Sequence, residues 1–141
     1  MYFDGIKKYF NGFVYEGSYK PGGNRNAAAY MANFARENNL YIRGHVLVYD
    51  GFGMTPKKAY TLDEIKNMSY DEYYDLMVHE IAGRISYLGD YLQEVELANE
   101  LPDYRDARNK FGWDITTDLL EAANELLGDG KIKVINSTGV S

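Results

Sequence analysis

The chain has no cysteine among its 141 residues. This absence excludes disulfides, cysteine-ligated zinc and thiol catalysis, but it leaves the compartment open because many exported proteins also lack disulfides. No apolar run approaches the roughly 20 residues that a membrane span requires, and no signal-peptide pattern stands at the start. The sequence therefore predicts no membrane partner and a chain that is either cytosolic or separated from its export signal.

Positive charge is also scarce, since 15 Lys and Arg residues stand against 21 Asp and Glu residues, which gives a net charge of -6. Such a chain has no basic footprint for nucleic acid, so we expect no nucleic-acid partner. A phosphate loop, a Gly-x-Ser-x-Gly elbow, a dinucleotide fingerprint and a metal-ligand cluster are missing as well. The sequence therefore predicts no cofactor and no metal.

Tyrosine, in contrast, is abundant, with 14 copies beside six phenylalanines and one tryptophan. Aromatic rings stack on the C–H faces of sugars, and tyrosine hydroxyls bond to sugar hydroxyls. Most of these rings are expected in the core or in partly buried surface positions. The length and the 45% apolar content predict one domain over residues 1–141 with a stable core.

Helical and strand patterns alternate along the chain. Residues 27–38 have helical spacing and precede a buried apolar run at 40–49, while Ser69 and Glu72 form a capping box for a helix to about Tyr87. Further strands are expected at 10–15, 95–99 and 132–135, a further helix at 115–127, and a loop at 50–62, while residues 101–114 are polar and charged without an assigned element. This β-α-β-α-β-α-β order predicts an α/β fold with a parallel sheet and helical crossovers.

Polar residues stand at the ends of two expected strands. Asn99 and Glu100 close the segment that begins at Val95, and His45 stands at the start of the run that ends at Tyr49. The carboxyl ends of parallel strands meet at one face, where a carboxylate can do acid or base chemistry. A strand-end glutamate can equally be solvated, and a lone histidine on a strand is more often a buried core residue. From the residues alone, both interpretations stay open.

Four segments also fit a known pattern in order and rough spacing. The stretch AAYMANFARENNLYIRGHVLVY at 28–49 is similar to a helix followed by RGHTLVWH, and VELANE at 95–100 to WDVVNE. KIKVINS at 131–137 is similar to KLYIND, and YFNGFVYEGSYK at 9–20 to a motif in which FN precedes ENxMKW. Together they resemble strands two to five of glycoside hydrolase family 10, the endo-β-1,4-xylanases.

The resemblance implies a partial (β/α)8 TIM barrel, whose complete form needs about 250 residues. It implies hydrolysis of β-1,4-xylan or a related plant polysaccharide with retention, by two carboxylates about 5–5.5 Å apart. Glu100 is the expected general acid/base. The strand that carries the nucleophile is expected to be missing, so the isolated chain is expected not to be a competent enzyme. The resemblance also implies a secreted protein.

Sugar-binding roles follow from the same resemblance. Asn99 would hold the sugar 2-hydroxyl through its amide, and His45 would bind a hydroxyl in the subsite next to the cleaved bond. The remaining residues that the resemblance places in the substrate site are Glu16, Lys20, Tyr49 and Asn136.

Five positions depart from the family pattern, which has Asn, Trp, Trp, His and Gln where this chain has Gly17, Pro21, Tyr49, Asp50 and Met54. Pro21, Asp50, Met54 and the expected absence of the nucleophile favour an alternative, a non-catalytic carbohydrate-binding remnant of the barrel. A third interpretation is a half-barrel fragment that functions with a partner. Because its two outer strands would be open edges, we expect a homodimer or a complex with a complementary barrel fragment.

Overall fold

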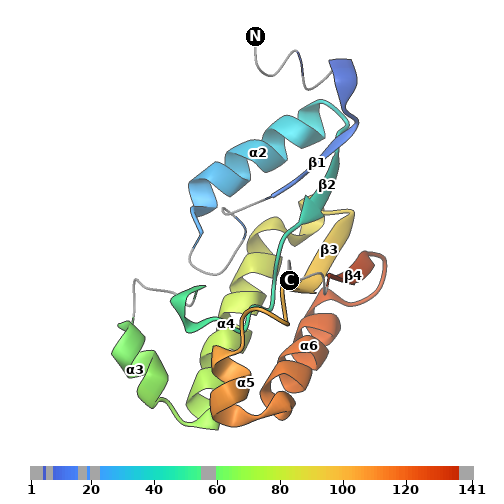
Figure 1. The fold of residues 1–141 in the computed structure, drawn as a ribbon. Helices are drawn as coiled ribbons and strands as arrows, with labels where there is room; N and C mark the ends of the chain where they lie inside the picture. The colour runs from blue at the N-terminus through green and yellow to red at the C-terminus, as the bar shows by residue number, and fades with distance from the viewer. Residues whose placement is uncertain (1–4, 6–7, 16–18, 20–22, 55–59, 137–141) are drawn as a thin grey trace.

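The computed structural model describes residues 5, 8–15, 19, 23–54 and 60–136. A four-stranded parallel sheet runs through this part of the chain, with neighbouring strands in sequence order (Figure 1). The strands are β1 (Gly12–Val14), β2 (Tyr41–Gly44), β3 (Glu94–Asn99) and β4 (Ile132–Asn136). The predicted parallel sheet with helical crossovers is confirmed.

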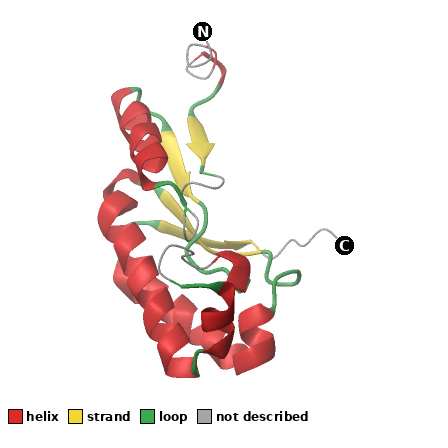
Figure 2. Cartoon of the chain, turned by 90° about the vertical axis from the view of Figure 1, so that its left-hand side faces the viewer, coloured by secondary structure: helices red, strands yellow, loops and turns green. Residues whose placement is uncertain are grey.

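Helices connect each strand to the next. They are α2 (Arg25–Glu37), α3 (Leu62–Asn67), α4 (Tyr70–Leu88), α5 (Asp106–Phe111) and α6 (Trp113–Leu127), with short 3-10 turns η1 (Phe52–Met54) and η2 (Gly89–Tyr91). The long helices lie on one side of the sheet (Figure 2). Within the described ranges, none of the helices has both the length and the apolar character needed to cross a membrane.

Capping boxes mark where two of the helices begin. The Ser69 hydroxyl accepts the amide of Glu72, whose carboxylate accepts the amide of Ser69 in return, as the sequence predicted for α4. Thr61 and Glu64 form a second capping box, which starts α3 at the end of the loop expected over 50–62. This helix was not predicted as a separate element because its six residues are too few to show helical periodicity.

The two faces of the sheet differ in character. Ala28, Ala32 and Ile42 belong to the core, which fills the space between helices and sheet. The side chains of register partners on parallel strands point to the same face. One set of partners crosses all four strands and has Val14 and Ile132 on the two outer strands, with Arg43 and Glu94 between them. These two apolar side chains are 52% and 57% exposed. The face turned away from the helices is therefore partly open in the described chain.

The expected strand over 40–49 is shorter than predicted, because β2 ends at Gly44. Beyond it, pairing with β3 continues through the amides of Leu47 and Val48. Two carbonyl groups of this segment accept hydrogen bonds from a side chain. Buried Arg84 of α4 donates to the oxygens of Val46 and Leu47 at 2.6 and 2.7 Å. The apolar run is thus buried as predicted, but an arginine replaces part of the strand pairing.

The polar stretch at 101–114, for which the sequence predicted no element, contains α5. Its first turn is attached to the segment after β2, because the Ala107 amide donates to the Asp50 carbonyl and the Phe52 amide donates to the Asp106 carboxylate, both at 3.0 Å. A six-residue helix is too short to be stable alone. These long-range hydrogen bonds, which a sequence pattern does not reveal, stabilise it.

Candidate functional site

Glu100 and Tyr49 meet at the carboxyl end of the sheet. Glu100 directly follows β3, and the Tyr49 hydroxyl, five residues beyond β2, donates to Glu100 Oε2 at 2.9 Å. The ring of Tyr104 lies 4.6 Å from that of Tyr49, centroid to centroid. The carboxylate is thus held beside an aromatic pair, partly buried and still reachable.

The backbone at Glu100 adopts an unusual conformation, with φ at +54°. A left-handed φ at a residue other than glycine is unfavourable by about 1 kcal/mol. Two hydrogen bonds support it, because the Glu100 carbonyl accepts the amides of Asp103 and Tyr104 at 3.0 and 3.1 Å. The turn therefore fixes the direction in which the carboxylate leaves the strand.

The Tyr49 hydroxyl is held as a proton donor. Burial, a hydrogen bond with Tyr104, and the hydrogen bond and negative charge of Glu100 together raise the pKa of Tyr49 well above its ordinary value. The phenol therefore stays protonated over the physiological range. It donates to the carboxylate and does not compete with it for a proton.

His45 follows β2 directly and lies beside Glu96, four residues before Glu100 in the chain. Its Nδ1 is 2.9 Å from Glu96 Oε2, and the same oxygen lies 3.1 Å from the Arg43 guanidinium. Arg43 also pairs with Glu94 at 3.0 Å. Glu96 is 2% exposed. Its carboxylate, which Arg43 also contacts, therefore fixes the orientation of the His45 ring.

The other predicted site residues fall into two groups. Asn99 is buried at the end of β3 and stands in register with Asn136 of β4, so both backbones lie at the same end of the sheet as Glu100. The side chain of Asn136 lies outside what the structure describes, and Glu16 and Lys20 lie outside the described residues altogether. Their assigned roles stay predictions.

Asp50, one of the departures from the family pattern, is an internal anchor. It is 1% exposed, accepts the Thr116 hydroxyl at 2.9 Å and forms an ion pair with Arg108. Burial raises its pKa, against the opposing effects of Thr116 and Arg108. Asp50 therefore links the segment after β2 to α5 and α6.

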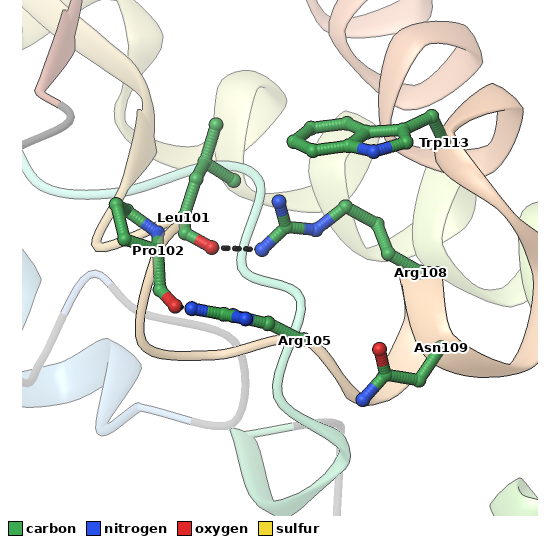
Figure 3. A pocket seen from close by; sticks show the side chains of 6 residues that line it. All are labelled: Leu101, Pro102, Arg105, Arg108, Asn109 and Trp113. Carbon is green, nitrogen blue, oxygen red and sulfur yellow. Dashed lines mark hydrogen bonds between the residues drawn. The ribbon is translucent and has the colours of Figure 1, made fainter.

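Sequence reasoning missed several residues that form or support the site. Tyr104, Glu96 and Arg84 showed no spacing signal, since their roles depend on contacts between elements distant in sequence. Trp113 stands out in the composition because it is the chain's single tryptophan. It helps to line a pocket beside the site (Figure 3). Among the described residues, no group of three histidine or carboxylate side chains is placed to hold a metal ion.

Comparison with solved structures places the fold in a class. Xylanase B from Clostridium stercorarium F9 superimposes with a TM-score of 0.72 at 20% identity, over 93% of this chain and 46% of that one. Xylanase 10B from Thermotoga maritima gives 0.77 at 18%, over 96% and 44%. A psychrophilic glycoside hydrolase family 10 endo-β-1,4-xylanase gives 0.74 at 22%, over 91% and 44%.

These likenesses define the fold. The chain is a partial (β/α)8 barrel that resembles glycoside hydrolase family 10 xylanases, and it spans less than half the length of each. The predicted fold class and family resemblance are confirmed at this level. No protein-family model and no curated protein matches the sequence.

Proposed function

We propose that the chain forms part of a retaining glycoside hydrolase that acts on β-1,4-xylan or a related plant polysaccharide, with Glu100 as general acid/base. The observation that carries the proposal is the hydrogen bond between Tyr49 and Glu100 at the carboxyl end of a barrel sheet. Active sites of (β/α)8 barrels are found at that end. The xylanase-like fold supports the choice of substrate, and an extracellular place of action is part of the proposal.

In the proposed reaction, protonated Glu100 gives its proton to the glycosidic oxygen as the bond to the anomeric carbon breaks. A second carboxylate, from outside residues 1–141, attacks that carbon and forms a glycosyl-enzyme ester. Glu100, now ionised, removes a proton from water, which displaces the ester with net retention. Asn99 and His45 bind sugar hydroxyls in this scheme.

The remaining strands of the barrel would come from a complementary segment or chain, or from a second copy. The exposed side chains of Val14 and Ile132 on the outer strands support this part of the proposal. Parallel strands at an open edge present unpaired backbone groups that recruit further strands. Sedimentation that shows a compact monomer with little dye-accessible apolar surface would contradict it.

Titration with xylotetraose, followed by NMR, tests the binding half of the proposal. We expect the signals of Tyr49, His45 and Asn99 to shift together, with weak affinity because part of the cleft is absent. Glu100→Gln should change this set of shifts, whereas Glu121→Gln, at an exposed position of α6, should not. Shifts confined to the helices would contradict a shared site.

A further inference from the structure

A pocket of about 520 Å³ lies next to the candidate site and has no part in the proposed reaction. Six residues that closely follow Glu100 line it, as Figure 3 shows: Leu101, Pro102, Arg105, Arg108, Asn109 and Trp113. Neighbouring Cα atoms are about 3.8 Å apart, so Leu101 lies within one sugar length of Glu100. The pocket therefore adjoins the candidate site.

The pocket has the opposite charge from the rest of the molecule. Two of its six lining residues carry a guanidinium group and none carries a carboxylate, although the chain has a net charge of -6. A local basic pocket in an acidic chain favours a ligand with a negative group. An anion would otherwise be repelled by this protein.

The two arginines differ in how their charges are used. Arg108 pairs with buried Asp50, donates to the carbonyls of Leu101 and Tyr104, and so is part of the framework. Arg105 is exposed, and its Nε donates to the Pro102 carbonyl, which holds the side chain at the pocket. Among the described residues, no carboxylate lies within ion-pair distance of Arg105. Its charge is available to a ligand.

Trp113 supplies a flat apolar surface beside these charges. The Arg108 guanidinium covers one face of its ring, 4.3 Å from the ring centre, and the residue is 64% exposed, so the face away from Arg108 is open. Indole faces of this kind stack on sugar rings, and the amide of Asn109 can both donate to and accept from hydroxyls. The pocket thus combines features that suit a sugar bearing a carboxylate.

We propose that this pocket binds a uronic-acid group carried by the oligosaccharide, with Arg105 on the carboxylate, Trp113 on the ring and Asn109 on a hydroxyl. The inference rests on the proposed function, and it narrows the substrate class to acidic, uronate-substituted xylan. A planar guanidinium suits a carboxylate because it donates two parallel hydrogen bonds.

Two matched ligands test the inference by calorimetry and NMR on the chain: xylotetraose bearing one glucuronate, and the same compound with that carboxyl group reduced to an alcohol. We expect the acid to bind about tenfold more tightly at low ionic strength, and the difference to shrink in about 0.5 M salt. Arg105→Gln should remove the difference, and it should weaken binding of the acid much more than binding of the neutral ligand. Arg36→Gln, whose guanidinium lies on the ring of Tyr91 away from the pocket, should change neither.

The possible results separate this inference from the proposed function. Equal binding of both ligands, with shifts at Tyr49 but none at Trp113, would overturn the pocket assignment and leave the proposed function standing. Free glucuronate that binds as tightly as the acidic oligosaccharide would also overturn the inference, because the pocket would then serve a small acid. An acid preference with shifts at Trp113 and none at Tyr49 or His45 would support a carboxylate pocket but contradict the proposed function.

Discussion

Tyr49 and Glu100 lie 51 residues apart in sequence, and the phenol of the first donates a hydrogen bond to the carboxylate of the second. Each residue follows a different strand of one parallel sheet. The contact exists because parallel strands end at the same edge. It is therefore a direct product of the fold and the closest connection between fold and proposed chemistry.

Removal of the Glu100 charge should change the titration of Tyr49. Because the charge and hydrogen bond of Glu100 add to burial and to the hydrogen bond with Tyr104 in raising the pKa of Tyr49, Glu100→Gln should lower that pKa. Burial and Tyr104 remain, so the pKa should stay above its ordinary value. Carbon NMR of the labelled phenol between about pH 8 and 11 measures the onset of ionisation, which should come at lower pH in Glu100→Gln than in the parent chain, with Glu121→Gln as the control. An unchanged titration would contradict the contact.

Buried tyrosines should make the fold sensitive to alkali. Burial raises the pKa of Tyr19 from 10.0 to about 12, and it raises the pKa of Tyr15 and Tyr73 further. Above pH 10 the unfolded state releases these phenol protons, while the folded state keeps them. The contribution of the protonated tyrosines to the free energy of unfolding is therefore complete below pH 10 and is lost as the pH rises through 12. For Tyr19 the loss is on the order of 2 kcal/mol.

Urea denaturation at pH 8, 10 and 11.5 measures the effect. Tyr19→Phe should reduce the alkaline loss, and it should leave stability at pH 8 unchanged or slightly higher, because the Tyr19 hydroxyl is buried with no hydrogen-bond partner among the described residues. A free energy of unfolding that is constant up to pH 11.5 would contradict the account.

Substitution of Arg84 should lower the stability of the fold strongly. It donates to the carbonyls of Tyr19, Val46 and Leu47 from within the core, and burial lowers its pKa to about 10. Arg84→Met should leave buried carbonyls unpaired and lower the free energy of unfolding by roughly 3 kcal/mol. Arg84→Lys should recover only part of this loss because an ammonium lacks the planar fork. Urea denaturation at pH 7 compares them, and equal stability of all three proteins would contradict the assignment.

Asp50 should behave as a structural anchor. Asp50→Ala removes the acceptor of Thr116 and leaves the Arg108 charge without its partner, which should lower the free energy of unfolding by about 3 kcal/mol. Asp50→Asn keeps an acceptor for Thr116 and should be less destabilising. Asp63→Asn, in the exposed first turn of α3, serves as the control. Loss of ligand binding with unchanged stability in Asp50→Ala would instead place Asp50 in the site.

Much of the fold was predictable because it depends on local patterns. The capping box at Ser69 and the apolar run before Asn99 each determine an element on their own. The alternation of helices and strands then leaves a parallel sheet as the expected arrangement. The position of Glu100 at the edge of that sheet follows from the same reasoning.

The surroundings of Glu100 were less predictable because they depend on contacts between distant segments. Tyr49 was assigned a sugar contact, but no pattern showed that it donates to Glu100. The helix α5 is too short for periodicity, so the pocket that it helps to form was not expected. The buried pairing of Asp50 with Arg108 joins residues that only the folded chain brings together.

The central claim, that Glu100 is the general acid, is tested most directly by two xylobiosides in the completed barrel, with residues 1–141 joined to or mixed with the remaining strands. Glu100→Gln should slow cleavage of the substrate with a poor leaving group by 10²–10⁴-fold, on the order of what general acid catalysis contributes. The initial release of dinitrophenol from a dinitrophenyl xylobioside should be nearly preserved because that leaving group needs no proton. Equal loss on both substrates, or no loss on either, would contradict the account.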